Sequence, residues 1–136
     1  MADMTKQIMD IFNNPGAAKV MATLDASGKI HVVPHGSIMA IAPDKVAFAK
    51  LMKGKTWENL EERKTVSLTV FLQGKPGESE GYQVKGVCEK LETWGELVDK
   101  YRQNMPSGVN LAGAGTIKVE EVYDVSVGPN CGARIA

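Results

Sequence analysis

The strongest constraint on this chain is a series of segments in which apolar and polar residues alternate. The alternation is clearest over 65–72, 82–88 and 117–127. A period of two places successive side chains on opposite faces of a strand, so these segments are predicted to be half-buried strands. Shorter segments of the same kind lie at 20–24, 30–33, 37–42 and 46–50. Because the early strands are joined by short turns, the pattern favours an antiparallel sheet or barrel over a doubly wound fold.

Apolar residues at helical spacing predict short helices around this mainly β core. The first helix is marked by Met4, Ile8, Ile11 and Phe12, and the last by Trp94, Leu97, Val98 and Tyr101. The last stripe predicts that Trp94 is buried. Between them, Thr56 is predicted to cap a helix over 57–63.

The length of 136 residues predicts a single domain over 1–136. Sixteen basic and sixteen acidic residues give a formal net charge of zero, which argues against a general nucleic-acid or anionic-membrane binder. The first residues lack the pattern of a signal peptide, and no run reaches the ~18 apolar residues of a membrane span. We therefore expect a cytoplasmic protein.

Several common chemistries have no support in the sequence. With only His31 and His35, a metal cluster is hard to build, and we expect no metal site. There is no nucleophile elbow, no phosphate-binding loop ending in Gly-Lys-Ser/Thr, and no dinucleotide-binding glycine motif. The alternation predicts that Cys88 is inert packing, whereas Cys131, among glycines, is expected to be exposed.

The most informative stretch runs from 45 to 57, where four lysines occur without a carboxylate. The stretch joins the end of a predicted strand to the start of a predicted helix. A helix N-terminus presents unpaired N–H groups and a partial positive charge, to which Lys55 and Thr56 add a cation and a hydroxyl. This arrangement predicts a phosphate cradle. The alternative is a solvated lysine face with an ordinary threonine cap.

A second candidate region follows the strand at 30–33. Pro34 removes one N–H from the ladder, and Gly36 allows a ligand or another backbone to approach closely. His35 and Ser37 flank that glycine. The alternative is that both histidines fill surface or core positions.

Read together, several segments resemble the pyridoxamine 5'-phosphate oxidase-like FMN-binding split β-barrel family. The segments are 22–34, 46–50, 55–60, 65–70 and 81–86. Their order and gaps match over roughly 17–92, and the chain is similar in size to the small FMN-binding proteins of anaerobic bacteria. The resemblance implies a six-stranded antiparallel split β-barrel with peripheral helices. It also implies a homodimer that holds one FMN per subunit at the interface.

The resemblance also implies which residues bind the cofactor. By the match they are Lys55 and Thr56 for the phosphate, Asn59 of the following helix, Phe48, Ala49 and Lys50 along the ring and ribityl chain, and Val33, Pro34, His35, Gly36 and Ser37 at the edge of the isoalloxazine. Trp94 or Tyr101 could reach the flavin of the partner subunit. Arg134 alone does not reproduce the arginine-bearing substrate motif of the vitamin-processing oxidases, so pyridoxamine phosphate oxidation is not expected.

These features favour an FMN flavoprotein that acts as an oxidoreductase or electron carrier, since the flavin would bring the redox chemistry. Lysines near 50–55 beside apolar strands suit a dianion that carries an apolar ring. A non-catalytic barrel that binds haem, a deazaflavin or a partner protein is the alternative. A single-stranded nucleic-acid barrel would place aromatic residues among the basic ones, and only Phe48 lies among the lysines of 45–55.

Overall fold

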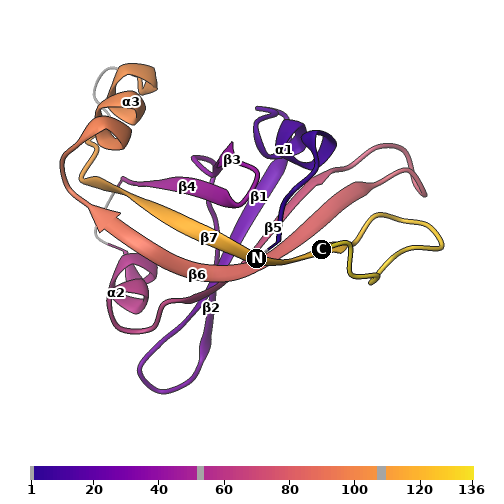
Figure 1. Cartoon of the computed structure of the whole chain (residues 1–136), viewed down its shortest axis with the longest axis horizontal. Helices are drawn as coiled ribbons and strands as arrows, with labels where there is room; N and C mark the ends of the chain where they lie inside the picture. The colour runs from indigo at the N-terminus through magenta and orange to yellow at the C-terminus, as the bar shows by residue number, and fades with distance from the viewer. Residues whose placement is uncertain (1, 52–53, 107–109) are drawn as a thin grey trace.

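The computed structural model describes residues 2–51, 54–106 and 110–136. Within these residues, seven strands form one antiparallel sheet and three short helices pack around it (Figure 1). The strands are β1 (Ala18–Leu24), β2 (Ile30–Pro34), β3 (Met39–Ala42), β4 (Lys45–Lys50), β5 (Thr65–Leu72), β6 (Glu80–Glu92) and β7 (Gly113–Asp124). The helices are α1 (Lys6–Phe12), α2 (Lys55–Glu62) and α3 (Glu96–Asn104).

The strand order in the sheet is β2-β1-β5-β6-β7-β4-β3, and β2 and β3 therefore lie at the two edges. The long strands β6 and β7 change register between Lys85 and Gly86 and again between Cys88 and Lys90. Such irregularities bend a strand and increase its twist. The sheet curls strongly without closing, as a split barrel does (Figure 1).

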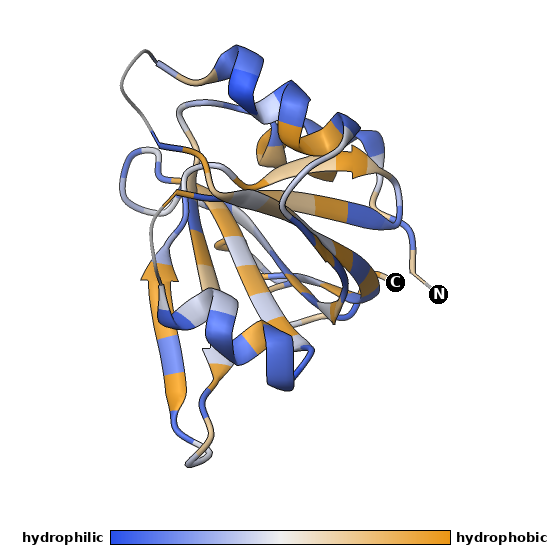
Figure 2. Ribbon diagram, turned by 90° about the vertical axis from the view of Figure 1, so that its left-hand side faces the viewer, coloured by the Kyte–Doolittle hydropathy of each residue, from blue (hydrophilic) through white to orange (hydrophobic). Residues whose placement is uncertain are grey.

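Two apolar clusters stabilise the curled sheet. The larger one fills its interior, and α1 contributes Ile8, Ile11 and Phe12 to it. The smaller cluster lies beneath α3, where buried Val98 and Tyr101 pack with alanines of β4 and β7. Those alanines are Ala47, Ala49 and Ala114. Small side chains allow a helix to approach a sheet closely, so α3 is held next to β4. The orange stripes along the strands in Figure 2 mark the apolar residues.

The mainly β antiparallel fold with peripheral helices is confirmed. The described sheet has seven strands where the resemblance implies six. The chain leaves the sheet after Pro34 and re-enters it at Met39, so that β2 and β3 are separate strands at opposite edges. The prediction of a strand beginning at residue 37 was therefore early by two residues.

Two local predictions were wrong. Thr56 does not cap α2, because Gly54 adopts the extended conformation of the N-cap and the helix already begins at Lys55. Trp94 is 83% exposed rather than buried. Gly95, with φ of 129°, separates Trp94 from α3, which begins only at Glu96, so the helical spacing does not apply to the tryptophan.

The two cysteines have the predicted environments, since Cys88 is buried and Cys131 is exposed. In the part of the chain that the structure describes, no helix has the length and apolar character needed to cross a membrane.

Candidate functional site

A groove of about 620 Å³ lies between the two ends of the curled sheet. One wall comes from β2 and the turn that follows it, and the other from β4 and the start of α2. Because β2 is an edge strand and β4 neighbours the opposite edge, the curl of the sheet brings them together. The lining residues are His31, Val33, Pro34, His35, Gly36, Ser37, Phe48, Ala49, Lys50, Leu51, Gly54, Lys55, Thr56, Trp57 and Met105.

The groove brings together every residue predicted for cofactor binding except Asn59. The two candidate regions of the sequence, the lysine-rich stretch and the stretch around His35, are thus opposite walls of one cavity. Of the four clustered lysines, Lys50 and Lys55 line the groove. Lys45 instead pairs with Glu89 at 2.9 Å, and Lys53 lies outside the described residues.

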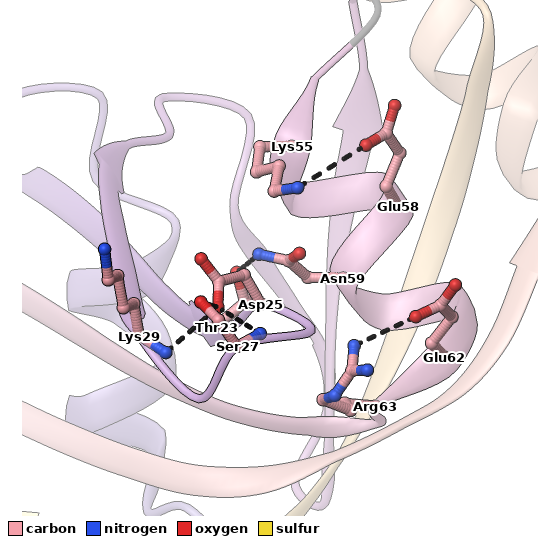
Figure 3. A network of polar contacts seen from close by, with 9 residues as sticks. All are labelled: Thr23, Asp25, Ser27, Lys29, Lys55, Glu58, Asn59, Glu62 and Arg63. Carbon is pink, nitrogen blue, oxygen red and sulfur yellow. Dashed lines mark hydrogen bonds and ion pairs between the residues drawn. The ribbon is translucent and has the colours of Figure 1, made fainter.

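At one end of the groove stands the N-terminus of α2. Its N-cap is Gly54, which has no side chain to accept hydrogen bonds from the first N–H groups of the helix. Unpaired N–H groups and the helix dipole together favour an anion at this position. Lys55 adds a cation whose Nζ lies 4.0 Å from Glu58 Oε2, and both of these side chains are largely exposed (Figure 3). The pairing is weak enough to leave Lys55 available to a bound anion.

Aromatic rings line the groove beyond this charged end. The centroids of Phe48 and Trp57 lie 6.3 Å apart, and those of His35 and Phe48 lie 5.5 Å apart, with both pairs edge-to-face. Lys50 Nζ lies 4.5 Å from the centroid of the Trp57 ring, a cation–π contact. The groove therefore has a mainly apolar lining next to two cations, which suits a ligand with a flat apolar part and an anionic end.

Ser37 organises the opposite end of the groove. Its hydroxyl accepts a hydrogen bond from the backbone N–H of Ala49 at 2.9 Å and lies 3.0 Å from His35 Nδ1. Its carbonyl accepts a hydrogen bond from the Tyr101 hydroxyl at 2.8 Å, which ties the turn to α3. Burial lowers the pKa of His35, so the imidazole is favoured in its neutral form.

Asn59 does not line the groove. It is 2% exposed, and its Nδ2 donates a hydrogen bond to Thr23 Oγ1 at 3.0 Å, as Figure 3 shows. Thr23 lies on β1 and is buried to the same extent. The pair therefore fastens α2 to the sheet.

Sequence reasoning missed two of the groove residues that shape its walls. Trp57 directly follows the predicted phosphate pair, and an aromatic residue beside clustered lysines was a signal that could have found it. Met105 follows α3 and is 50 residues away from Lys55 in the chain. Only the tertiary packing of α3 brings it to the groove, so no local pattern could have indicated it.

Comparisons with known proteins place this fold in a family. The family model described as pyridoxamine 5'-phosphate oxidase matches residues 4–125. No curated protein matches the sequence. The solved structure of Group A Streptococcus HupZ, carrying a V5 tag and a hexahistidine tag, is 23% identical, with 95% of this chain and 99% of that chain covered and a TM-score of 0.78.

Two other solved structures have the same fold. An FMN-binding protein from Syntrophomonas wolfei is 18% identical, with 89% of this chain and 85% of that chain covered and a TM-score of 0.79. An F420 reductase is 13% identical, with 88% and 98% covered and a TM-score of 0.69. At these identities the likeness concerns the fold alone. Because the family model spans most of the sequence, the chain belongs to the pyridoxamine 5'-phosphate oxidase family.

Proposed function

We propose that this protein is a flavoprotein that holds FMN in the groove and acts as an oxidoreductase or electron carrier. The observation that carries the proposal is that one cavity combines a cationic helix N-terminus with an apolar, aromatic lining. FMN combines the same features, with a dianionic phosphate at one end and an apolar isoalloxazine at the other. A cavity of about 620 Å³ is within the usual size range of cofactor sites.

The residues of the groove suit FMN part by part. Lys55, Thr56 and the first N–H groups of α2 would hold the phosphate, because anions bind favourably at helix N-termini. Phe48 and Trp57 would face the ring system, with Lys50 beside them. FMN supplies electron-transfer chemistry when bound, while the protein contributes orientation and electrostatics. This division of labour is consistent with the titratable groups that line the groove. Among its described lining residues these are the imidazoles of His31 and His35 and the amines of Lys50 and Lys55, with no carboxylate.

We also propose that the protein is a homodimer whose interface borders this groove. Support comes from large apolar side chains that the described chain leaves exposed. Ile30 and Val32 are 72% and 58% exposed on β2, the strand that forms one wall of the groove, and Trp94 before α3 is 83% exposed. Exposed apolar patches commonly mark interaction surfaces. Light scattering tests the proposal, because a particle of 14.7 kDa would contradict a dimer.

The function is tested by titrating the purified protein with FMN and, in parallel, with riboflavin. Saturation with FMN at ~100 times the dissociation constant should raise the free energy of unfolding by ~2.7 kcal/mol, which a thermal-shift measurement detects. Riboflavin lacks the phosphate and should bind more weakly, because it cannot use the α2 end. A colourless protein that gains no thermal stability from FMN would contradict the proposal.

A non-catalytic module for haem, a deazaflavin or a partner protein is the second candidate. The F420 reductase with the same fold favours including the deazaflavin in the titration, since F420 is a flavin analogue with its own phosphate. Tighter binding of F420 or haemin than of FMN would replace the first proposal by the second.

A further inference from the structure

The groove contains a hydrogen-bond chain that links Ala49, Ser37 and His35. The backbone N–H of Ala49 can only donate, so at 2.9 Å it uses a lone pair of the Ser37 hydroxyl oxygen. The Ser37 hydroxyl proton then points elsewhere. His35 Nδ1 lies 3.0 Å from the same oxygen and is the acceptor that can receive this proton. With the hydroxyl proton directed to His35, the chain runs from Ala49 through Ser37 to His35.

In the reverse arrangement, with the His35 proton on Nδ1, the Ser37 oxygen would accept two hydrogen bonds and its own proton would have to go to solvent in the groove. The direction from Ser37 to His35 instead pairs every proton of the chain within the protein. Within the described residues, the Ser37 hydroxyl makes no other hydrogen bond than these two. A neutral imidazole carries one N–H and one lone pair, so a lone pair on Nδ1 places the proton on Nε2.

The Nε2 side of the ring belongs to the groove. His35 lines the cavity, and the described part of the chain provides no hydrogen-bond partner for Nε2. None of its fully buried side-chain nitrogen or oxygen atoms lacks a partner, so an unpartnered Nε2 is accessible to solvent. The imidazole is fixed on its other edges by Ser37 and by the edge-to-face contact with Phe48.

We propose that Ser37 fixes His35 as a neutral Nε2–H donor, so that the groove selects ligands with a hydrogen-bond acceptor at the end opposite α2. The inference rests on the proposed function, because FMN has such acceptors in the carbonyl oxygens and bare ring nitrogens of its isoalloxazine. Ser37 is a positioning residue and His35 a specificity-determining one. Reduction of a flavin makes these acceptors richer in electrons, so the N–H donor favours the reduced cofactor and raises its potential.

The same arrangement disfavours haem. An imidazole binds iron through a lone pair, and Nε2 carries a proton in this tautomer. Ligation by His35 would require the proton to move to Nδ1 and the Ser37 hydroxyl to give up its present direction. In this tautomer, the Nε2 position therefore suits a ligand with a hydrogen-bond acceptor better than a metal centre.

The first test is ¹⁵N NMR of the imidazole rings in the protein without added cofactor. The chain has only two histidines, and His31→Gln leaves the His35 signals alone. We expect a protonated Nε2 and a bare Nδ1 at neutral pH. Ser37→Thr keeps a hydroxyl and should preserve this tautomer, whereas Ser37→Ala should give a mixture. A protonated Nδ1 in the native protein would overturn the inference, whether or not Ser37→Ala folds.

The second test compares FMN binding by His35→Gln and His35→Leu. Glutamine keeps an N–H donor and leucine does not. Loss of one neutral hydrogen bond should weaken FMN binding by ~2- to 10-fold in His35→Leu and should lower the reduction potential of bound FMN. His35→Gln should recover much of both. Equal behaviour of the two variants would overturn the role of His35. Failure of the native protein to bind FMN would overturn the proposed function instead, and the NMR result would still stand.

Discussion

The two ends of the groove are built in different ways. At the α2 end, the charge sits on exposed side chains and on the start of a helix, with Lys55 only loosely paired to Glu58. At the other end, Ser37 is held by hydrogen bonds from Ala49 and Tyr101, two residues far from it in the sequence. One end attracts a ligand by charge, and the other orients it by packing and directed hydrogen bonds.

This difference predicts different responses to mutation. A change that disturbs Phe48 or Ala49 at the packed end should alter both folding and binding, since these two side chains belong to the core. A change at the charged end should alter binding alone and should depend on salt, because interactions between exposed charges are screened. Each variant below tests one side of this contrast.

The largest effect on stability is expected from Gly115→Ala at the packed end. Gly115 lies opposite Phe48 in the pairing of β4 with β7, and a Cβ at this position would overlap the Phe48 ring. Phe48 is 1% exposed and cannot move away freely. Overpacking of this kind costs ~1–3 kcal/mol, so we expect such a fall in the free energy of unfolding, measured by urea denaturation.

Gly36→Ala is the matched control, because a Cβ at Gly36 would meet no atom within 4 Å. This variant should keep the native free energy of unfolding. If FMN lies against Gly36, as the sequence predicts, the added methyl group should still weaken FMN binding. Equal stability losses in the two glycine variants would contradict the assignment of Phe48 to a tightly packed wall.

The largest effect on FMN binding is expected from Lys55→Ala at the charged end. A charge-assisted hydrogen bond to phosphate is worth ~1.5–3 kcal/mol, so FMN binding should weaken by ~10- to 100-fold. Riboflavin binding should change little, and the difference between the two ligands should shrink in high salt. Lys75→Ala, in the loop between β5 and β6, is the control for loss of a surface lysine. An unchanged FMN dissociation constant in Lys55→Ala would remove Lys55 from the site.

The contrast between the two ends also explains what the sequence could predict. The charged end is local, because Lys50, Lys55 and Thr56 are close neighbours in the chain and line the same groove. Their spacing alone predicts a phosphate cradle, which FMN binding by Lys55→Ala tests. The antiparallel β architecture was equally predictable, since alternation is a local property of each strand.

The packed end depends on contacts that sequence separation conceals. Tyr101 reaches Ser37 across 64 positions, and no spacing rule connects them. Asn59 shows a related limit, because the motif indicates a cofactor contact but not the hydrogen bond that its amide donates to Thr23 on β1. Trp94 was misplaced because one glycine with positive φ interrupts the helical spacing. Tertiary packing decided all three cases.

A third, smaller effect is expected from Asn59→Ala, which tests whether α2 is held by its anchor on β1. Removing the amide leaves the buried Thr23 hydroxyl without its donor, and such a loss costs ~1–3 kcal/mol. We expect a fall in the free energy of unfolding near the lower end of that range, with a smaller loss of FMN affinity than in Lys55→Ala. A double-mutant cycle with Thr23→Ala should show coupling between the two residues. A large loss of FMN affinity at unchanged stability would instead indicate a direct contact between Asn59 and the cofactor.

The smallest effect is expected from pH at the packed end. Burial lowers the pKa of His35 below its ordinary value of ~6.5, so the unfolded chain takes up a proton at a higher pH than the folded protein does. The free energy of unfolding should therefore be highest above pH ~6.5 and should decrease as the pH falls below that value toward the pKa of the folded state. Denaturation curves collected across this interval, on the protein without cofactor, measure the decrease. His35→Gln should make the decrease shallower, and His31→Gln should leave the His35 contribution in place. If both variants keep the native pH profile, the imidazole of His35 is not held neutral by its surroundings, and the packed end of the groove does not orient it as the hydrogen bonds indicate.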